Sequence, residues 1–500
     1  MTTKETKQKP KQKPNQKTIN TKLILLIVIL IIIIGVTRFK SKSDFKNTYA
    51  FIKENDDNPY SFKPIDKPLK VKYKKCKYLK LQNTLDEIFT KYKCDRINEN
   101  DDNWDLYILC GYNYAETELK NIKITHPGQK IYAIRGCDKI ASKNELWKIV
   151  RDFYGNREAA QLIPESFIIN DPLDVKMFKK RFDKKKLYLL KKNIQRKEGI
   201  LLTNDFDRIL KIIDKTKKDI KDYYNPLNFD ANTNLDDYYN GITVKSNKNN
   251  KYNSGKKETH NTTKKDNKDN KDNKDNKDNG VKEEEDLNKN QKINSLINNY
   301  KIIQIYIDDL YLIKKRKCNL RLYLLIVCNK GDKRGYLYNQ GKCIYTNKDY
   351  DNSKKKTTFD KEEHLTSYLL DQDIYKTHPE SLNDLKMFLG DKKFNCLWNQ
   401  INTLFVNVMA AIYGKICNSK KLNNILTFQL FGADIIFTND MHPYLLEFNK
   451  GPSMKYMNRR DKLMKLKLTE DIFKQVNIIP YEKGEKSNFN AIVIKNYKNF

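Results

Sequence analysis

The residues best suited to chemistry lie in the stretch FGADIIFTNDMHPYLLEFNKGPSM, residues 431–454. Two apolar runs flank the turn TNDMHP, and Asp434 and Glu447 stand at equal distances from its centre. An antiparallel hairpin would place these carboxylates opposite one another, with Asn449 on the same face as Glu447. Oxygen ligands without His or Cys suit Mg²⁺, which usually brings nucleotide phosphates with it. The alternative is an ordinary hairpin whose polar side chains face water.

The segments around this hairpin alternate between apolar strands and amphipathic helices. IIQIYI at 302–307 and LRLYLLIVC at 320–328 are typical of buried strands. WNQINTLFVNVMAAIYGKIC at 398–417 carries apolar residues at three-to-four spacing and predicts a long helix. This alternation indicates a mixed α/β fold.

The composition of the N-terminal part predicts a membrane anchor. Residues 1–22 are basic and polar, which predicts a disordered tail. Leu23 to Val36 contains no polar side chain, so residues 23–37 are predicted to be a transmembrane or signal-anchor segment. Residues 38–70 form a polar stalk. The expectation is a single-pass membrane protein, with an orientation that the sequence leaves open.

The remainder is expected to fold as one domain over residues 71–480, followed by a C-terminal tail at 481–500. Residues 243–290 interrupt this domain with repeated KDN triplets and no core-forming side chains. They predict a disordered low-complexity insert.

Charge and cysteine content limit the partners and the redox state. The 97 Lys and Arg residues exceed the 63 Asp and Glu residues and give a net charge of +34, which favours acidic partners. No stacking-aromatic module or zinc motif accompanies this charge, so no nucleic acid is expected as a partner. The nine cysteines are scattered without a CxxC pair, which predicts reduced thiols rather than a disulfide framework.

Several blocks resemble the tubulin-tyrosine-ligase-like family of ATP-grasp enzymes. FGAD, YLLEFN and GPS match in order the family pattern FGxDxxxD…WLxExNxxPS. Further blocks keep the family's order: WDLYI at 104–108, LIPESFII at 162–169, YLLKKNIQRKEGILL at 188–202, IIQIYIDDLYLI at 302–313 and RKCNLRLYLLI at 316–326. Apart from the insert, the resemblance covers roughly residues 75–470.

The resemblance implies a complete site for Mg²⁺ and ATP. Asp434, Glu447 and Asn449 would bind the metal. The implied nucleotide-binding residues are Lys191, Gln304, Ile307, Lys317, Asn319, His364 and Thr366. Catalytic roles would fall to Lys317, Arg321 and Glu447.

The implied activity is an ATP-dependent ligase that adds a free amino acid, with glutamate favoured, to a carboxylate of tubulin or another acidic protein. The reaction would pass through an acylphosphate. Asn319 stands where the family has Asp, and Ile344 falls where it carries a substrate-binding Arg. These departures keep an alternative open: an ATP-grasp pseudoenzyme, tethered to the membrane, that binds without turnover.

Overall fold

The computed structural model describes residues 48–53, 72–75, 82–98, 100–109, 115–193, 199–223, 299–351, 359–366, 370–482 and 485–496. The predicted tail, anchor and insert (1–22, 23–37 and 243–290) lie outside these residues, as does most of the predicted stalk. The chain divides into two compact units, Met1–Ala50 with Ile494–Phe500 and Phe51–Val493. The fold and the site described below belong to the second unit.

The strands and helices alternate along the chain, as the sequence predicted. The strands are β1 (Thr48–Lys53), β2 (Lys72–Lys75), β3 (Asp95–Arg96), β4 (Leu106–Ile108), β5 (Lys130–Tyr132), β6 (Ser166–Ile168), β7 (Tyr188–Lys191), β8 (Ile200–Thr203), β9 (Ile302–Ile305), β10 (Leu312–Ile313), β11 (Arg316–Asn329), β12 (Asp332–Tyr338), β13 (Lys342–Tyr345), β14 (Leu426–Phe437), β15 (Pro443–Asn449) and β16 (Phe489–Asn496). The helices are α2 (Gln82–Lys91), α3 (Ala115–Asn121), α4 (Cys137–Ala141), α5 (Lys143–Tyr154), α6 (Asn156–Ala159), α7 (Pro172–Arg181), α8 (Phe206–Tyr223), α11 (Lys361–His364), η4 (Gln372–Lys376), α12 (Leu382–Leu389), α13 (Asp391–Ile412), η5 (Tyr413–Lys415) and α14 (Arg459–Gln475). The predicted mixed α/β fold class is confirmed.

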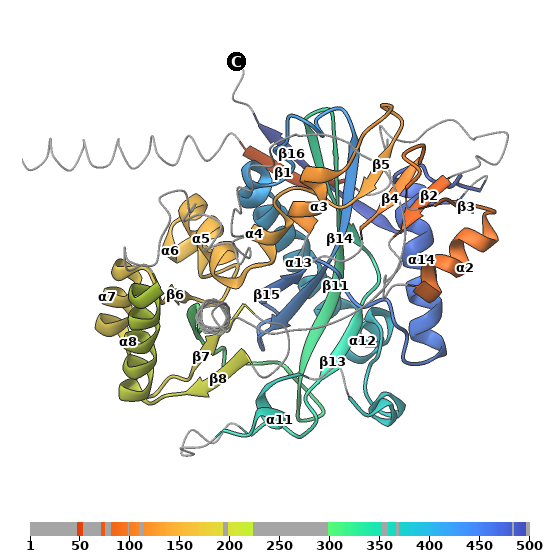
Figure 1. The fold of residues 1–500 in the computed structure, drawn as a ribbon. Coiled ribbons are helices and arrows are strands. Elements are labelled where there is room, and N and C mark those ends of the chain that lie inside the picture. Colours follow the sequence, from red (N-terminus) through yellow and green to blue (C-terminus); the bar gives the residue numbers. More distant parts are fainter. Residues whose placement is uncertain are drawn as a thin grey trace, which may run out of the picture. The chain divides into compact units, whose positions relative to one another are not determined.

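The larger sheet is built around the long strands β11 and β14, which run antiparallel through the centre of Figure 1. Its strand order is β16-β12-β11-β14-β5-β4-β2-β3, with β10 and β13 paired to β11 and β15 paired to β14. One face packs against α2 and α14 through a buried apolar cluster that includes Phe89, Tyr323, Phe428 and Phe473. Arg321 is two residues from Tyr323 on β11, so the same face turns from apolar to charged along the strand.

The smaller sheet has the order β6-β9-β7-β8, and its neighbouring strands run antiparallel. Phe178 of α7 and Ile209 of α8 pack against one face in a cluster with Leu190 and Ile303. Lys191 and Gln304 follow these two residues by one position, so they lie on the opposite face. The face without α7 and α8 therefore carries the polar side chains.

Three expectations from the sequence need correction. The protein was expected to be a single-pass membrane protein, but the part of the chain that the structure describes holds no helix that is long and apolar enough to cross a membrane. The predicted C-terminal tail contains β16, which pairs with β12 and buries Phe489 and Ile492. The prediction of reduced thiols fails at one pair, because Cys328 and Cys417 form a disulfide. Residues 89 positions apart give no spacing signal of such a pair. The prediction is confirmed for Cys94, Cys137, Cys318, Cys343 and Cys396, which are free.

Candidate active site

The acidic hairpin forms as the sequence predicted. β14 and β15 pair with Asp434 opposite Glu447 and Gly432 opposite Asn449, with a bulge just after Asp434. Direct cross-strand partners point to the same face, so the two carboxylates and the amide lie together. The predicted pairing of Asp434 with Glu447, with Asn449 on the same face, is confirmed, whereas the role of the three residues as metal ligands stays a prediction.

Arg321 neutralises the first carboxylate. It is the cross-strand partner of Asp434 on β11, and its Nε and Nη2 donate to the two carboxylate oxygens at 2.5 and 3.1 Å. This bidentate geometry fixes both side chains. Burial raises the pKa of Asp434 above its ordinary value even though Arg321 opposes the change. Gly432 makes room for the pair, since a Cβ there would lie 3.2 Å from Cδ of Arg321.

Lys143 neutralises the second carboxylate. Its Nζ lies 3.1 Å from Oε2 of Glu447, and its side chain is only 12% exposed. Burial alone would raise the pKa of Glu447, but Lys143 and Lys191 outweigh it and the pKa is lowered. Glu447 is therefore held as a carboxylate.

Asn193, just beyond β7 of the smaller sheet, fixes the start of α5. Its Oδ1 accepts a hydrogen bond from the backbone N–H of Lys143 at 3.2 Å. Its Nδ2 donates to Ser142 and Asn144 at 2.9 and 2.7 Å. The smaller sheet therefore helps to position a side chain that reaches the larger one.

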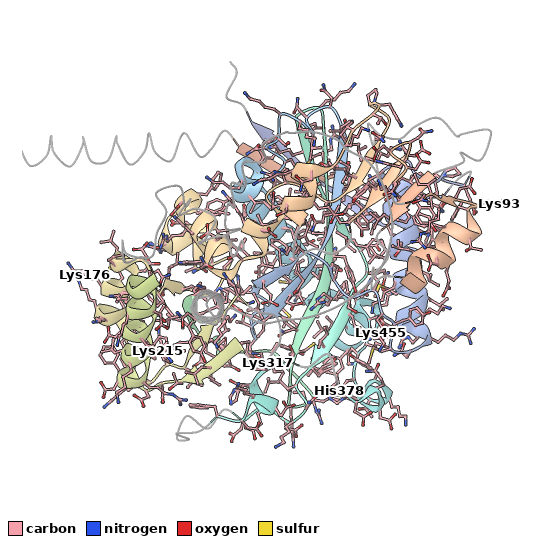
Figure 2. All side chains as sticks on the ribbon, in the orientation of Figure 1. Lys93, Lys176, Lys215, Lys317, His378 and Lys455 are labelled. Atoms are coloured by element: carbon pink, nitrogen blue, oxygen red, sulfur yellow. A yellow bond between two sulfur atoms is a disulfide. The ribbon has the colours of Figure 1, made fainter. Side chains whose placement is uncertain are left out.

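Two further lysines are buried beside this cluster. Nζ of Lys191 donates to Oε1 of Gln304 at 2.6 Å, and burial lowers the pKa of Lys191 to about 8. Lys317 lies over the ring of Tyr306 at 4.7 Å, and burial, helped by the charge of Lys191, lowers its pKa to about 7. Figure 2 shows Lys317 in the interior of the fold, whereas Lys93 and Lys215 lie at its periphery and are exposed. In a lysine-rich chain, burial separates these cations from ordinary surface lysines.

The other predicted nucleotide residues extend from Lys317. The hydroxyl of Tyr306 shares a 3.2 Å hydrogen bond with Nδ1 of the buried His364. Asn319 donates from Nδ2 to the hydroxyl of Thr366 at 3.0 Å. Ile307 is half-buried two residues after β9. The structure thus places the predicted residues in one connected region, and their roles toward a nucleotide remain predictions.

The sequence model of the tubulin-tyrosine ligase family matches residues 122–486. This chain belongs to that family. The match takes in the hairpin, the buried lysines and the smaller sheet, so the resemblance found in the sequence is confirmed.

Individual relatives in this family match over a shorter stretch. A probable tubulin polyglutamylase of Rattus norvegicus is 27% identical over 197 residues, covering 38% of this chain and 41% of the relative. A probable beta-tubulin polyglutamylase of Tetrahymena thermophila is 26% identical over 208 residues, covering 37% and 17%. A tubulin polyglutamylase of Caenorhabditis elegans is 26% identical over 188 residues, covering 34% and 26%. The matched part of this family member therefore spans less than half the length of these relatives.

The residues of this family member suit Mg²⁺ and a nucleotide. The described ranges hold no cluster of three or more His, Cys, Asp or Glu side chains. The predicted donor set is two carboxylates and an amide. Such oxygen ligands suit Mg²⁺, and each oxygen of Asp434 keeps a second lone pair beside Arg321. Oδ1 of Asn319 and Nδ2 of Asn449 are buried and find no hydrogen-bond partner among the described residues. Both atoms are therefore available to hydrogen-bond a group bound at this site.

Lys143 is the residue that the sequence analysis missed. It lies at the first position of α5, where the helix dipole disfavours a cation. A lysine at the start of an amphipathic helix could therefore have indicated that its side chain has an anionic partner. The sequence gives no sign of which partner, because Glu447 lies 304 positions further along the chain.

The two departures from the family pattern lie opposite one another. Asn319 of β11 is the cross-strand partner of Ile344 of β13. An acid and an arginine at these positions would form a cross-strand ion pair. Replacing only one of them would leave the other charge buried without its partner, at a cost of several kcal/mol. Replacing both by uncharged side chains avoids that cost.

Proposed function

We propose that this family member is an ATP-dependent ligase that joins an amino acid to a carboxylate of an acidic protein acceptor. The observation that carries the proposal is the convergence of Lys143, Lys191 and Arg321 on the carboxylates of Asp434 and Glu447. Lys317 is buried within reach of the charge of Lys191. Three cations around two carboxylates leave an excess of positive charge, and Lys317 adds to it when protonated. This excess suits the phosphates of ATP, and the two sheets would hold the nucleotide between them as in an ATP-grasp fold.

The residues divide the chemistry among them. Mg²⁺, held by Asp434, Glu447 and Asn449, would draw charge from the transferred phosphoryl group. Lys191 and Lys317 would orient the phosphates and offset the charge that develops during transfer. Arg321 opposes the rise in the pKa of Asp434 and fixes its carboxylate in place. An acceptor carboxylate attacks the γ-phosphorus, ADP leaves, and the amine of the incoming amino acid then displaces phosphate from the acylphosphate to form an amide.

Tubulin is the favoured acceptor and glutamate the favoured amino acid. The support comes from the relatives, which are named as tubulin polyglutamylases. The net charge of +34 is consistent with a glutamate-rich acceptor segment.

Mass spectrometry tests this proposal directly. The full chain would be incubated with Mg-ATP, tubulin and isotopically labelled amino acids, and a glutamate increment is expected on tubulin. Glu447→Gln and Lys191→Ala should abolish it, whereas Lys215→Ala, an exposed lysine on α8, should not. Tight binding of Mg-ATP without any increment would instead favour the pseudoenzyme, and loss of ATP binding as well would exclude the nucleotide site.

A further inference from the structure

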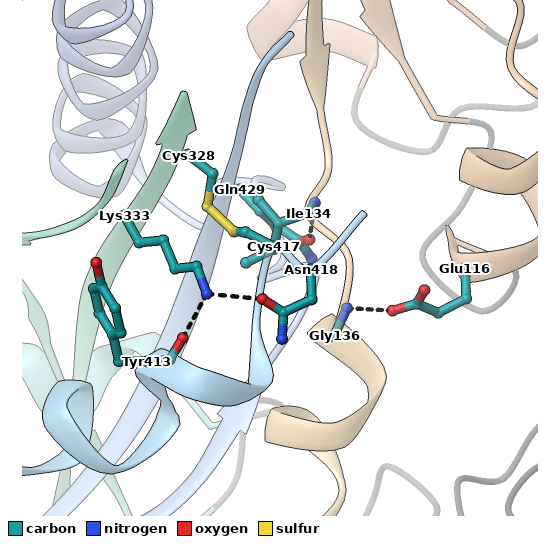
Figure 3. Close-up of a disulfide and its surroundings, with 9 residues drawn as sticks. All are labelled: Glu116, Ile134, Gly136, Cys328, Lys333, Tyr413, Cys417, Asn418 and Gln429. Atoms are coloured by element: carbon teal, nitrogen blue, oxygen red, sulfur yellow. Dashed lines mark hydrogen bonds between the residues drawn. A yellow bond between two sulfur atoms is a disulfide. The ribbon is translucent and has the colours of Figure 1, made fainter. Parts of the chain in front are cut away.

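A disulfide ties the end of β11 to the segment that follows α13. Cys328 is buried near the end of β11, and Cys417 is half-buried two residues after η5. Their Cα atoms are 6.3 Å apart (Figure 3). Lys333 holds the same segment, because its Nζ donates to the carbonyl of Tyr413 and to Oδ1 of Asn418, both at 2.9 Å. The segment is thus held by one disulfide and by two hydrogen bonds from Lys333.

The segment that contains Cys417 contacts the turn that precedes α4. The backbone N–H of Cys417 donates to the carbonyl of Arg135 at 2.8 Å. Gly136 has a φ of +86°, and a Cβ there would lie 2.4 Å from the carbonyl oxygen of Lys415. Only glycine fits this approach. The segment Lys415–Cys417 is therefore in direct contact with the turn.

The same turn leads into the candidate active site. α4 starts directly after Gly136, and its Asp138 forms an ion pair with Lys450, the residue after Asn449. α5 follows α4 and begins with Lys143, which pairs with Glu447. The disulfide is therefore connected to the end of β15 in the acidic hairpin, at Glu447 and Lys450, by a short run of contacts.

Gln429 of β14 adds a second connection between the turn and the hairpin. Its Oε1 accepts a hydrogen bond from the backbone N–H of Ile134 at 3.0 Å, and its Nε2 donates to the carbonyl of Lys450 at 2.6 Å. Gln429 is fully buried, so both bonds are shielded from water.

We propose that the Cys328–Cys417 disulfide is a thiol-exchange site whose redox state sets the position of Lys143 and thereby the affinity for ATP. The reductant is a dithiol. Its first thiolate attacks one sulfur to give a mixed disulfide and releases the other cysteine, which takes up a proton. Its second thiol then displaces the remaining cysteine, so the protein gains two electrons and two protons and the reductant leaves as a disulfide.

The surroundings of the disulfide favour this exchange. Both cysteines line a small opening, together with Arg135 and Lys333. Cations beside a thiol stabilise the thiolate that exchange requires. Cys417 has a φ of +60°, a left-handed conformation that non-glycine residues seldom adopt, so its backbone can relax once the bond is cut. Because Lys333 still holds the segment, reduction should shift the turn without unfolding the chain.

Peptide mapping of the full chain tests whether the bond forms. Unfolding and alkylation without reductant should yield the peptides of Cys328 and Cys417 as one cross-linked species, which dithiothreitol separates. Cys396, exposed on α13 and free, should be alkylated in both samples. Alkylation of Cys328 and Cys417 without reductant would overturn the proposal.

Amide hydrogen exchange and ATP titration then test the coupling, which rests on the proposed function only through ATP binding. Dithiothreitol should speed exchange at Cys417 and Gly136 and weaken Mg-ATP binding by about tenfold. The double variant Cys328→Ser, Cys417→Ser should show the amide exchange and the Mg-ATP affinity of the reduced protein, and dithiothreitol should not change them. Cys396→Ser should behave as the unchanged chain. Unaltered exchange, or tight ATP binding by the double variant, would refute the coupling. If the oxidised chain binds no ATP, the proposed function fails, and the exchange rates still show whether the disulfide controls the turn.

Discussion

At the scale of single residues, the ion pair between Lys143 and Glu447 allows the sharpest mutational test. Lys143→Met keeps the length and apolar stem of the side chain but removes its charge. Glu447 would lose the largest of the attractions that lower its pKa, and the phosphates would lose one cation. We expect the Kd for Mg-ATP to rise about tenfold, as calorimetry can measure, with a smaller effect on stability.

The matched control for this change is Lys148→Met on the same helix. Lys148 is exposed, so its replacement should leave ATP binding unchanged. Equal effects of the two variants would mean that net charge, rather than the contact with Glu447, governs binding.

Lys317 predicts a specific pH dependence of stability. Its pKa is about 7 in the folded chain and about 10.4 in an unfolded one, so the unfolded chain binds more protons between these values. Stability contributed by this site therefore rises with pH from 7 to about 10.4, with a slope of at most ~1.4 kcal/mol per pH unit. Below pH 7 both states are protonated and the cost of burying the charge is present in full.

Urea unfolding across pH 6.5–9.5 can measure this effect as a difference between the unchanged chain and Lys317→Met. The variant should be the more stable at low pH, and its advantage should shrink as the pH rises. An advantage that does not vary with pH would contradict the lowered pKa of Lys317.

At the scale of elements, the close approach of β11 and β14 depends on Gly432. A Cβ at this position would lie 3.0 Å from Cβ of Pro452 and 3.2 Å from Cδ of Arg321. Gly432→Ala should displace Arg321 from Asp434 and reduce the free energy of unfolding by about 1–3 kcal/mol. Denaturant unfolding and ATP titration would both register the change.

Gly414→Ala is the comparison for that variant. A Cβ at Gly414 meets nothing within 4 Å, so stability and ATP binding should stay as they are. A harmless Gly432→Ala would show that β14 has room for a side chain and that the Arg321–Asp434 pair needs no glycine beside it.

The hairpin shows how far the sequence alone can reach at this scale. Its register follows from two apolar runs placed symmetrically about one turn, which is local information. The contact of Arg321 with Asp434 joins residues 113 positions apart, and only the resemblance to a family placed them in one site. Asn193 as the cap of α5 and the Cys328–Cys417 disulfide had no such guide, because neither spacing nor side-chain type shows which distant segments meet.

At the scale of the whole molecule, the candidate site draws on both sheets. The smaller sheet supplies Lys191 and Gln304, and the larger sheet supplies Lys317, Arg321 and Glu447. A ligand that touches both sheets stabilises the folded chain by mass action, and at a hundred times its Kd it would add about 2.7 kcal/mol. We therefore expect Mg-ATP to raise the melting temperature in a concentration-dependent manner.

Variants on the two sheets decide whether the nucleotide bridges them. Lys191→Ala on the smaller sheet and Glu447→Gln on the larger should each remove most of the thermal shift at a fixed ATP concentration, because each deletes one side of the same site. Lys215→Ala, on α8 of the smaller sheet but exposed, should keep the full shift. If Lys191→Ala also kept it, the nucleotide would bind to the larger sheet alone. The buried pair of Lys191 and Gln304 would then be a structural feature of the smaller sheet.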